Sequence, residues 1–158
     1  SYTFTKYKSL FSSDMIGKIG ITGKAVNTIR NEHVRVSKRL YIPYNKLRGF
    51  EYGGLGPVEN GDYIGGNYSS TINLSTTLPQ ILPSFQSIDF SYFIDIGNIW
   101  GVDYNESLDS KSSIRSSTGF GMDFLSPVGP INFSLTQPIT KKSSDKTETF
   151  RFNLGTTF

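Results

Sequence analysis

The chain has no cysteine and contains only one histidine, one tryptophan and two methionines among its 158 residues. Without cysteine it can form neither disulfides nor thiolate metal sites. No run approaches the roughly 18 consecutive apolar residues that a membrane-spanning helix needs. The excess of 16 Lys and Arg over 13 Asp and Glu is small and spread along the chain, so it does not indicate nucleic-acid binding.

Residues suited to catalysis or metal binding are also scarce. His33 follows Glu32 in a charged stretch, and no nucleophile–base–acid set or metal cluster stands near it in the sequence, so we interpret it as a surface residue. Asp103, Glu106 and Asp109 lie in one polar segment, but their spacing lacks the repeated ligand pattern of a calcium loop. We therefore expect no enzyme, no cofactor and no metal.

What the chain does contain is a series of runs in which apolar and polar residues alternate. The final run is the clearest, with Phe150, Phe152, Leu154 and Phe158 on one face and polar or small residues on the other. This period of two is typical of β-strands. The runs expected to be strands cover residues 2–11, 16–29, 68–76, 88–100, 113–124, 131–136 and 150–158. Residues 34–42 are either an eighth strand or a basic lead-in to a loop, and we favour the lead-in.

Alternation of this kind occurs in soluble sandwiches and in membrane barrels, which differ in the face that meets water. Here the polar faces carry Gly, Ser, Asn, Arg and Asp, which suit a watery or plugged lumen. Aromatic residues near strand ends suit interfacial girdles: Tyr92, Trp100, Phe124 and Phe158. We expect an all-β, transmembrane, antiparallel up-and-down β-barrel of about 7–8 strands, either a minimal barrel or the carboxy-terminal half of a 16-stranded one.

The expected organisation is a single barrel domain over residues 1–158, with a long loop at about residues 30–64. Ser1 opens directly into a strand-like run without a signal peptide. An exported protein with this start would be a mature form or a fragment.

The most informative motif is Leu47-Arg48-Gly49-Phe50, within a basic, glycine-rich segment that separates two groups of strands. Further segments follow it in one order: Gly65-Gly66-Asn67, residues 93–100, residues 114–119, Ser126-Pro127-Val128-Gly129-Pro130, and the terminal strand that ends on Phe158. Together they resemble the carboxy-terminal half of the barrel in the BamA family of outer-membrane assembly factors, within the surface-antigen superfamily. The resemblance covers nearly the whole chain, although residues 1–46 match only by strand pattern.

The resemblance implies that Arg48 folds back into the lumen and pairs with Asp95. The residues allow this, because Asp95 lies on the polar face of its run and the planar arginine fork can make two hydrogen bonds to a carboxylate. The alternative is a solvated Arg48 and a turn-forming Asp95. Ser75 stands where the family commonly has a glutamate, so Arg48 is expected to have fewer partners, or to recruit Asp123 or Asp89.

The resemblance also implies a function and a location. The chain would help to insert and fold β-barrel proteins in the bacterial outer membrane, without covalent chemistry. Its partners would be the lipid bilayer, unfolded outer-membrane proteins, and periplasmic or lipoprotein assembly partners, but no nucleic acid. The terminal strand would present a recognition signal through Phe150, Phe152, Leu154 and Phe158. Two alternatives stay open: a transporter barrel of the TamA or two-partner-secretion type, and a small structural eight-stranded barrel.

Overall fold

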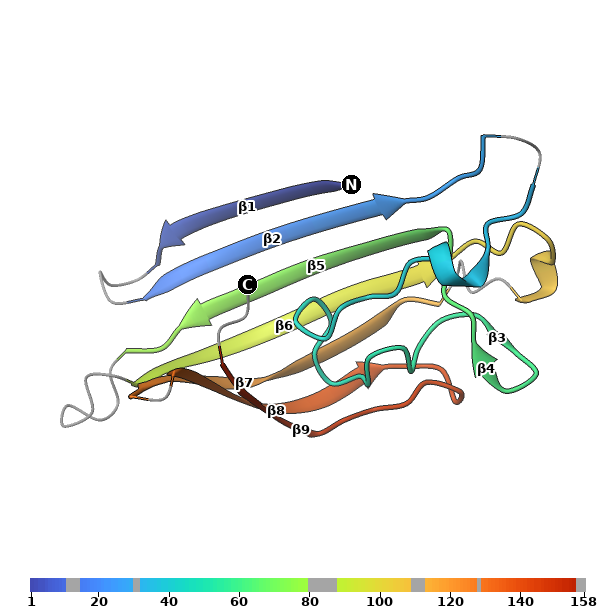
Figure 1. Ribbon diagram of the computed structural model, residues 1–158. Helices are drawn as coiled ribbons and strands as arrows, with labels where there is room; N and C mark the ends of the chain where they lie inside the picture. Colours follow the sequence, from blue (N-terminus) through green and yellow to red (C-terminus); the bar gives the residue numbers. More distant parts are fainter. Residues whose placement is uncertain (11–14, 30–31, 80–87, 109–112, 128, 156–158) are drawn as a thin grey trace.

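The fold is described from a computed structural model of the chain, covering residues 1–10, 15–29, 32–79, 88–108, 113–127 and 129–155. Seven strands form one antiparallel sheet in the order β1-β2-β5-β6-β7-β8-β9 (Figure 1). Their bounds are β1 (Tyr2–Ser9), β2 (Ile16–Ala25), β5 (Tyr68–Thr77), β6 (Ile88–Trp100), β7 (Arg115–Ser126), β8 (Gly129–Thr140) and β9 (Phe150–Leu154). The expected all-β antiparallel fold is confirmed.

Two small elements interrupt the long connection between β2 and β5. The first is a 3₁₀-helix, η1 (Val36–Lys38), and the second is the hairpin β3 (Val58–Glu59) and β4 (Asp62–Tyr63). A further 3₁₀-helix, η2 (Glu106–Leu108), follows β6. Residues 34–42 form a lead-in and not an eighth strand of the sheet, as expected. The hairpin was not predicted, because two-residue strands are too short to show alternation, although Asn60-Gly61 is a strong turn signal.

The sheet is open. β1 and β9 lie at its two edges, and no ladder joins them within the described part of the chain. Of the two barrel sizes expected from the sequence, this arrangement favours half of a larger barrel over a minimal closed one.

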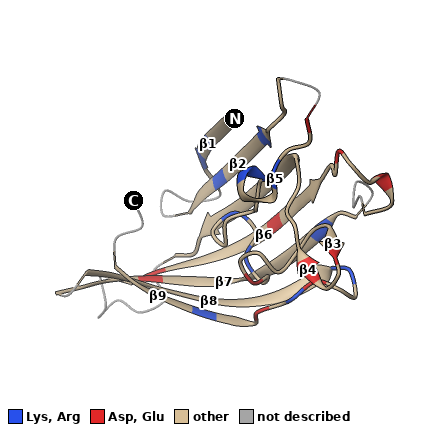
Figure 2. Ribbon diagram, turned by 45° about the vertical axis from the view of Figure 1, so that its right-hand side comes forward, with Lys and Arg blue, Asp and Glu red and all other residues tan. Residues whose placement is uncertain are grey.

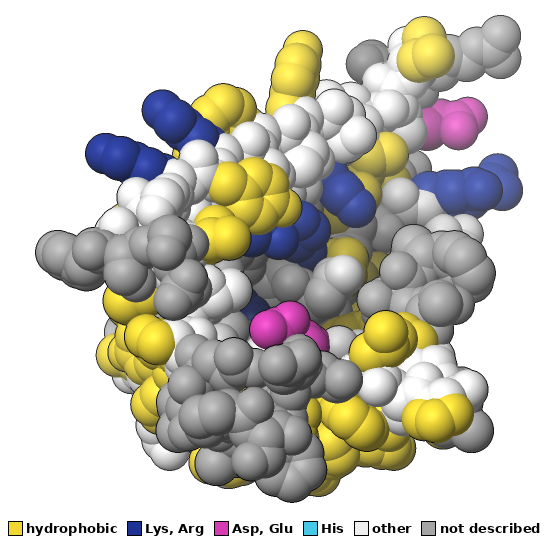
Figure 3. Space-filling view, turned by 90° about the vertical axis from the view of Figure 1, so that its left-hand side faces the viewer, with side chains coloured by type: hydrophobic (Ala, Val, Ile, Leu, Met, Phe, Trp, Pro, Cys, Tyr) yellow, Lys and Arg dark blue, Asp and Glu magenta, His cyan; other side chains and the backbone are white. Residues whose placement is uncertain are grey.

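The two faces of the sheet have the opposite polarity from those of a soluble domain. Large apolar side chains are exposed on the outer face, among them Ile72, Leu74, Phe120, Leu135 and Leu154. Buried polar side chains occupy the other face, among them Thr22, Ser69, Thr71, Asn73, Asp95, Arg115, Ser117 and Thr136. Figure 3 shows the chain curled around a hollow, with charged side chains inside it and apolar side chains around the outside. We call the inner face lumenal, and this arrangement suits a sheet whose outer face meets lipid.

The connections between strands differ in length at the two ends of the sheet. The two longest, β2–β5 and β6–β7, leave from the same end as β8–β9 (Figure 1). Many of the acidic positions lie in these connections (Figure 2). No helix among the described residues is long and apolar enough to cross a membrane.

The apolar core of the described chain lies between the long loop and the lumenal face, not within a sandwich of sheets. It consists of Ile42, Leu47, Phe50, Leu55 and Ile99. Four of these residues belong to the β2–β5 connection, and Ile99 belongs to β6. The loop is therefore fixed to the inside of the sheet by hydrophobic burial before any ion pair is considered.

Candidate functional site

The segment around Leu47-Arg48-Gly49-Phe50 is held by two apolar anchors. The side chains of Leu47 and Phe50 are almost completely buried in the core with Ile99. The loop backbone turns just before them, where the Lys46 N–H donates to the Pro43 carbonyl at 2.9 Å. The anchors place the intervening Arg48 against the lumenal face of β6.

Arg48 and Asp95 form a bidentate ion pair. Arg48 Nε and Nη2 donate to the two carboxylate oxygens at 2.7 and 2.9 Å, and the Arg48 backbone N–H donates to Oδ2 at 3.1 Å. Asn73 Nδ2 donates to Asp95 Oδ1 at 2.8 Å. The Asp95 side chain is 0% exposed and that of Arg48 is 23% exposed. Four hydrogen bonds thus compensate the buried carboxylate for the water it has lost.

Arg48 has no acidic partner other than Asp95 among the described residues. No ion pair joins it to Asp123 or Asp89, the two acids considered as replacements for the missing glutamate. Asp123 instead accepts a hydrogen bond from Asn132. Of the two alternatives, Arg48 therefore has fewer acidic partners and does not recruit Asp123 or Asp89. The aromatic ring of Phe93 lies beneath the guanidinium, 3.4 Å from Arg48 Cζ to the ring centre. Cation–π attraction adds to the ion pair in holding Arg48.

Gly49 is required by its surroundings. Its φ of +89° is in the left-handed region that other residues rarely adopt. A Cβ at this position would lie 3.2 Å from Ser117 Cβ and 3.3 Å from Thr136 Cβ. Ser117 also donates a hydrogen bond to the Arg48 carbonyl. The close approach of the loop to β7 and β8 therefore depends on glycine.

Beyond Gly49 the loop runs beside the β8–β9 connection. Phe50 and Thr147 form an antiparallel bridge. Three backbone hydrogen bonds complete this pairing: Glu51 N–H to the Lys146 carbonyl at 3.1 Å, Lys146 N–H to the Gly54 carbonyl at 2.7 Å, and Glu148 N–H to the Gly49 carbonyl at 3.0 Å. We call residues 49–54 and 146–148, joined in this way, the docking strip.

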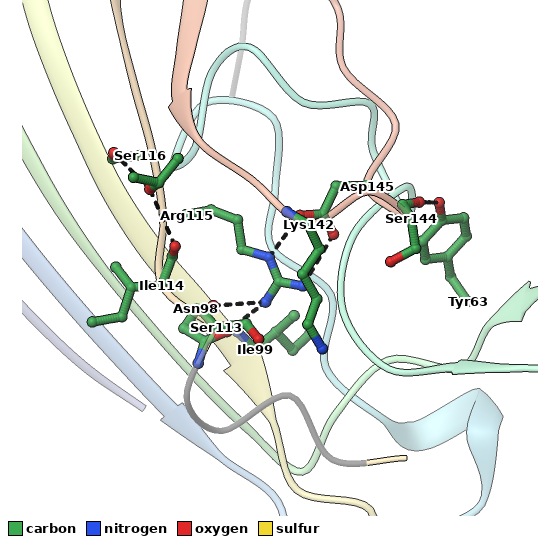
Figure 4. A network of polar contacts seen from close by, with 11 residues as sticks. Tyr63, Asn98, Ile99, Ser113, Ile114, Arg115, Ser116, Lys142, Ser144 and Asp145 are labelled. Carbon is green, nitrogen blue, oxygen red and sulfur yellow. Dashed lines mark hydrogen bonds and ion pairs between the residues drawn. The ribbon is translucent and has the colours of Figure 1, made fainter. Parts of the chain in front are cut away.

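A second buried ion pair, which the sequence did not predict, lies next to the docking strip. Arg115 Nε and Nη2 donate to the two carboxylate oxygens of Asp145, both at 3.0 Å (Figure 4). Arg115 Nη1 donates to Asn98 Oδ1 at 2.6 Å and to the Ser113 carbonyl at 2.9 Å. The Lys142 backbone N–H donates to Asp145 Oδ2 at 2.6 Å. The alternation in β7 placed Arg115 on the polar face, but no sequence signal connected it to Asp145.

A third charged cluster lies in the loops, outside the strands. Arg39 Nη2 is 3.2 Å from Asp103 Oδ1, and the Val34 backbone N–H donates to Asp103 Oδ2 at 2.7 Å. Burial raises the pKa of the Asp103 carboxyl. Hydrogen bonds from Val34 and the Asn67 side chain, together with the Arg39 charge, outweigh that effect, so its pKa lies below the ordinary value.

The histidine that we interpreted as a surface residue lies at the edge of this cluster. The His33 side chain is mostly exposed, with Nδ1 4.0 Å from Asp103 Oδ1. No group of acidic and histidine side chains that could hold a metal ion occurs among the described residues.

The residues proposed for a terminal recognition signal lie on the outer face of β9. Phe150, Phe152 and Leu154 are exposed there. Phe133 on β8 packs beside the two rings, with centroid distances of 6.2 Å to Phe150 and 5.1 Å to Phe152. Phe158 lies outside the described residues.

Comparisons with known proteins show the fold and the family of this chain. A crystal structure of BamA from Haemophilus ducreyi lacking POTRA domains 1–3 superposes with a TM-score of 0.80 at 24% identity. The match covers 95% of this chain and 33% of that chain, and it shows the fold.

Two curated relatives carry the name outer membrane protein assembly factor BamA. The protein of Neisseria meningitidis serogroup B is 30% identical over 183 residues, which is 98% of this chain and 23% of the relative. That of Neorickettsia risticii is 26% identical over 155 residues, or 96% of this chain and 21% of the relative. This chain therefore spans less than a quarter of the length of either relative.

A family model described as the Omp85 superfamily domain matches residues 1–158, the whole of the sequence. The resemblance inferred from the order of the motifs is confirmed by this match. The chain belongs to the Omp85 superfamily.

Proposed function

We propose that this chain is the barrel portion of an outer-membrane protein assembly factor, which inserts and folds β-barrel proteins into the bacterial outer membrane. The relatives from N. meningitidis and N. risticii bear that name and match nearly all of this chain. The chain acts physically in this proposal, through strand pairing and lipid contact, without covalent chemistry. Its partners are the outer-membrane bilayer, unfolded outer-membrane proteins, and periplasmic or lipoprotein assembly partners.

The observation that best supports this function is the loop docked inside the sheet through Arg48 and Asp95. A loop fixed against the lumenal face fills space that a passenger would need to cross the barrel. In this proposal an incoming strand pairs at the β9 side of the complete barrel, outside the filled lumen. This combination favours assembly at the edge over transport through the lumen.

We assign Arg48 the role of a brace that keeps the loop inside the barrel, with Leu47, Gly49 and Phe50 fixing its path. Asp95 is the partner that holds the brace. Phe150, Phe152 and Leu154, with Phe158 at the chain end, form the terminal signal by which this barrel is itself assembled. The domain is a single barrel unit, with residues 30–64 as its long loop.

The test uses the full chain reconstituted in lipid vesicles with an unfolded eight-stranded outer-membrane protein as substrate. Heat-dependent gel mobility measures how fast the substrate folds. Arg48→Ala and Asp95→Ala are compared singly and together, with Arg35→Ala, an exposed arginine of the same loop, as the matched control.

We expect each single variant to slow substrate folding, the double variant to be little worse than either, and Arg35→Ala to behave like the unmodified chain. Vesicles that fold the substrate no faster than empty ones would contradict the assembly function. Transfer of a secreted passenger into the vesicles would instead support the transporter alternative.

A further inference from the structure

The ion pair of Arg115 and Asp145 is more deeply buried than that of Arg48 and Asp95. Both of its side chains are 0% exposed. The hydrogen bonds to Asn98, Ser113 and Lys142 leave the pair closely surrounded by polar partners (Figure 4). Removal of one member would leave an uncompensated buried charge, which is strongly destabilising locally. Such a pair fixes the position of whatever it joins.

What it joins is the β8–β9 connection to the middle of the sheet. Asp145 lies in that connection, directly before residues 146–148 of the docking strip. Arg115 begins β7 and contacts Asn98 on β6. The ion pair therefore holds the connection at the place where the loop segment 49–54 pairs with it.

The two ion pairs also lie two rungs apart in the same ladder, on the same face of the sheet. In the pairing of β6 with β7, Gly97 lies opposite Arg115 and Asp95 lies opposite Ser117. Ser117 donates to the Arg48 carbonyl, so β7 contributes to both sites. A displacement at Asp145 thus has two short routes to the Arg48 segment, one through the docking strip and one through β7.

We infer that Arg115 and Asp145 are positioning residues that couple the lumenal loop to the terminal β8–β9 hairpin. They hold residues 146–148 as an edge on which residues 49–54 dock, so that the loop and the hairpin are fixed or released together. This inference rests on the proposed function for its consequence: an incoming strand that displaces the β9 edge also loosens the Arg48 brace.

Site-resolved hydrogen exchange on the full chain in lipid tests the coupling. The variant is Asp145→Asn, which keeps the side-chain shape and removes its charge. The reporters are the amides of Arg48 and Glu51, which donate to Asp95 and to the Lys146 carbonyl. The matched control is Lys141→Gln, which removes the charge of an exposed residue of the same connection outside the docking strip.

We expect Asp145→Asn to accelerate exchange at Arg48 and Glu51 by about tenfold or more, with Leu74 and Ile94 in the β5–β6 ladder unchanged. Lys141→Gln should leave the two reporters unchanged. Faster exchange confined to Lys142 and the substituted position itself, or spread equally over the sheet, would overturn the coupling.

If Asp145→Asn does not fold, a second variant tests the same coupling. Arg115→Lys keeps the positive charge but loses the fork that binds both carboxylate oxygens, and the same reporters decide the outcome. No substrate protein takes part in the exchange measurement. A failure of the assembly proposal would therefore appear in the vesicle assay, separately from a failure of the coupling.

Discussion

The guanidinium carbon of Arg48 lies 3.4 Å from the centre of the Phe93 ring, on the same strand that carries Asp95. The ring and the carboxylate hold the guanidinium from two directions, and Phe93 is completely buried. The ion pair fixes the position of the guanidinium, and the ring fixes its orientation. Asp95 and Phe93 together hold the loop against one face of β6.

Phe93→Leu should weaken the loop attachment while keeping most of the buried apolar volume. We expect a loss of about 1 kcal/mol in the free energy of unfolding from the cation–π contact, beyond the cost of repacking. Urea unfolding in lipid measures it. In an Arg48→Ala background the same substitution should cost less, and equal costs in both backgrounds would show that the ring does not act through Arg48.

Gly49→Ala should be more costly than the same change at Gly53. Both positions have positive φ, but a Cβ at Gly53 meets nothing within 4 Å, whereas one at Gly49 crowds Ser117 and Thr136. We expect about 1 kcal/mol for the backbone alone at Gly53 and roughly 2–3 kcal/mol at Gly49. Unfolding free energies of the two variants, measured side by side, isolate the close approach of the loop to β7 and β8, and equal values would argue against it.

The Asp103 cluster should lose its hold on the loop only in acid. The pKa of Asp103 is lowered in the folded state. The carboxylate therefore contributes fully to the stability of the loop above the unfolded pKa of about 3.9, and this contribution is lost as pH falls through the lower folded pKa. The protection of the Val34 amide against hydrogen exchange, corrected for the intrinsic rate, should therefore stay constant between pH 7 and 5.

Asp103→Asn provides the reference for this measurement. It should show weakened Val34 protection already at neutral pH, because the Arg39 partner is lost. A fall in protection of the unmodified chain well above the unfolded pKa of an aspartate would contradict the assignment to Asp103.

Phe152→Ala should impair assisted folding of this barrel more than spontaneous folding. Loss of the ring contact with Phe133 costs about 1 kcal/mol in either reaction. A signal read by assembly machinery adds a further loss only when that machinery is present. Phe120→Ala is the control, since its ring is also exposed and contacts one partner, Tyr92 at 5.3 Å, away from the terminal strand. If the ratio of assisted to spontaneous folding rate were the same for both variants, β9 would have a structural role only.

The strands were largely predictable because alternation with a period of two depends only on neighbouring residues. The run expected at residues 88–100 matches β6 (Ile88–Trp100), whereas that at residues 16–29 ends earlier, at Ala25. The polar face of β6, including Asp95, also followed from the alternation. What made Arg48 a candidate partner for Asp95 was the order of motifs along the chain and not any local pattern.

Local patterns of residues are enough to specify the all-β class, the strands and their two faces, because these depend on side chains only a few positions apart. Which charges meet depends instead on how the strands and loops are arranged in space. Arg115 and Asp145 are 30 residues apart, and their contact depends on the register of β6, β7 and β8 and on the path of the β8–β9 connection. The contact of Arg48 with the Phe93 ring is likewise a matter of side-chain geometry in three dimensions, which alternation cannot express.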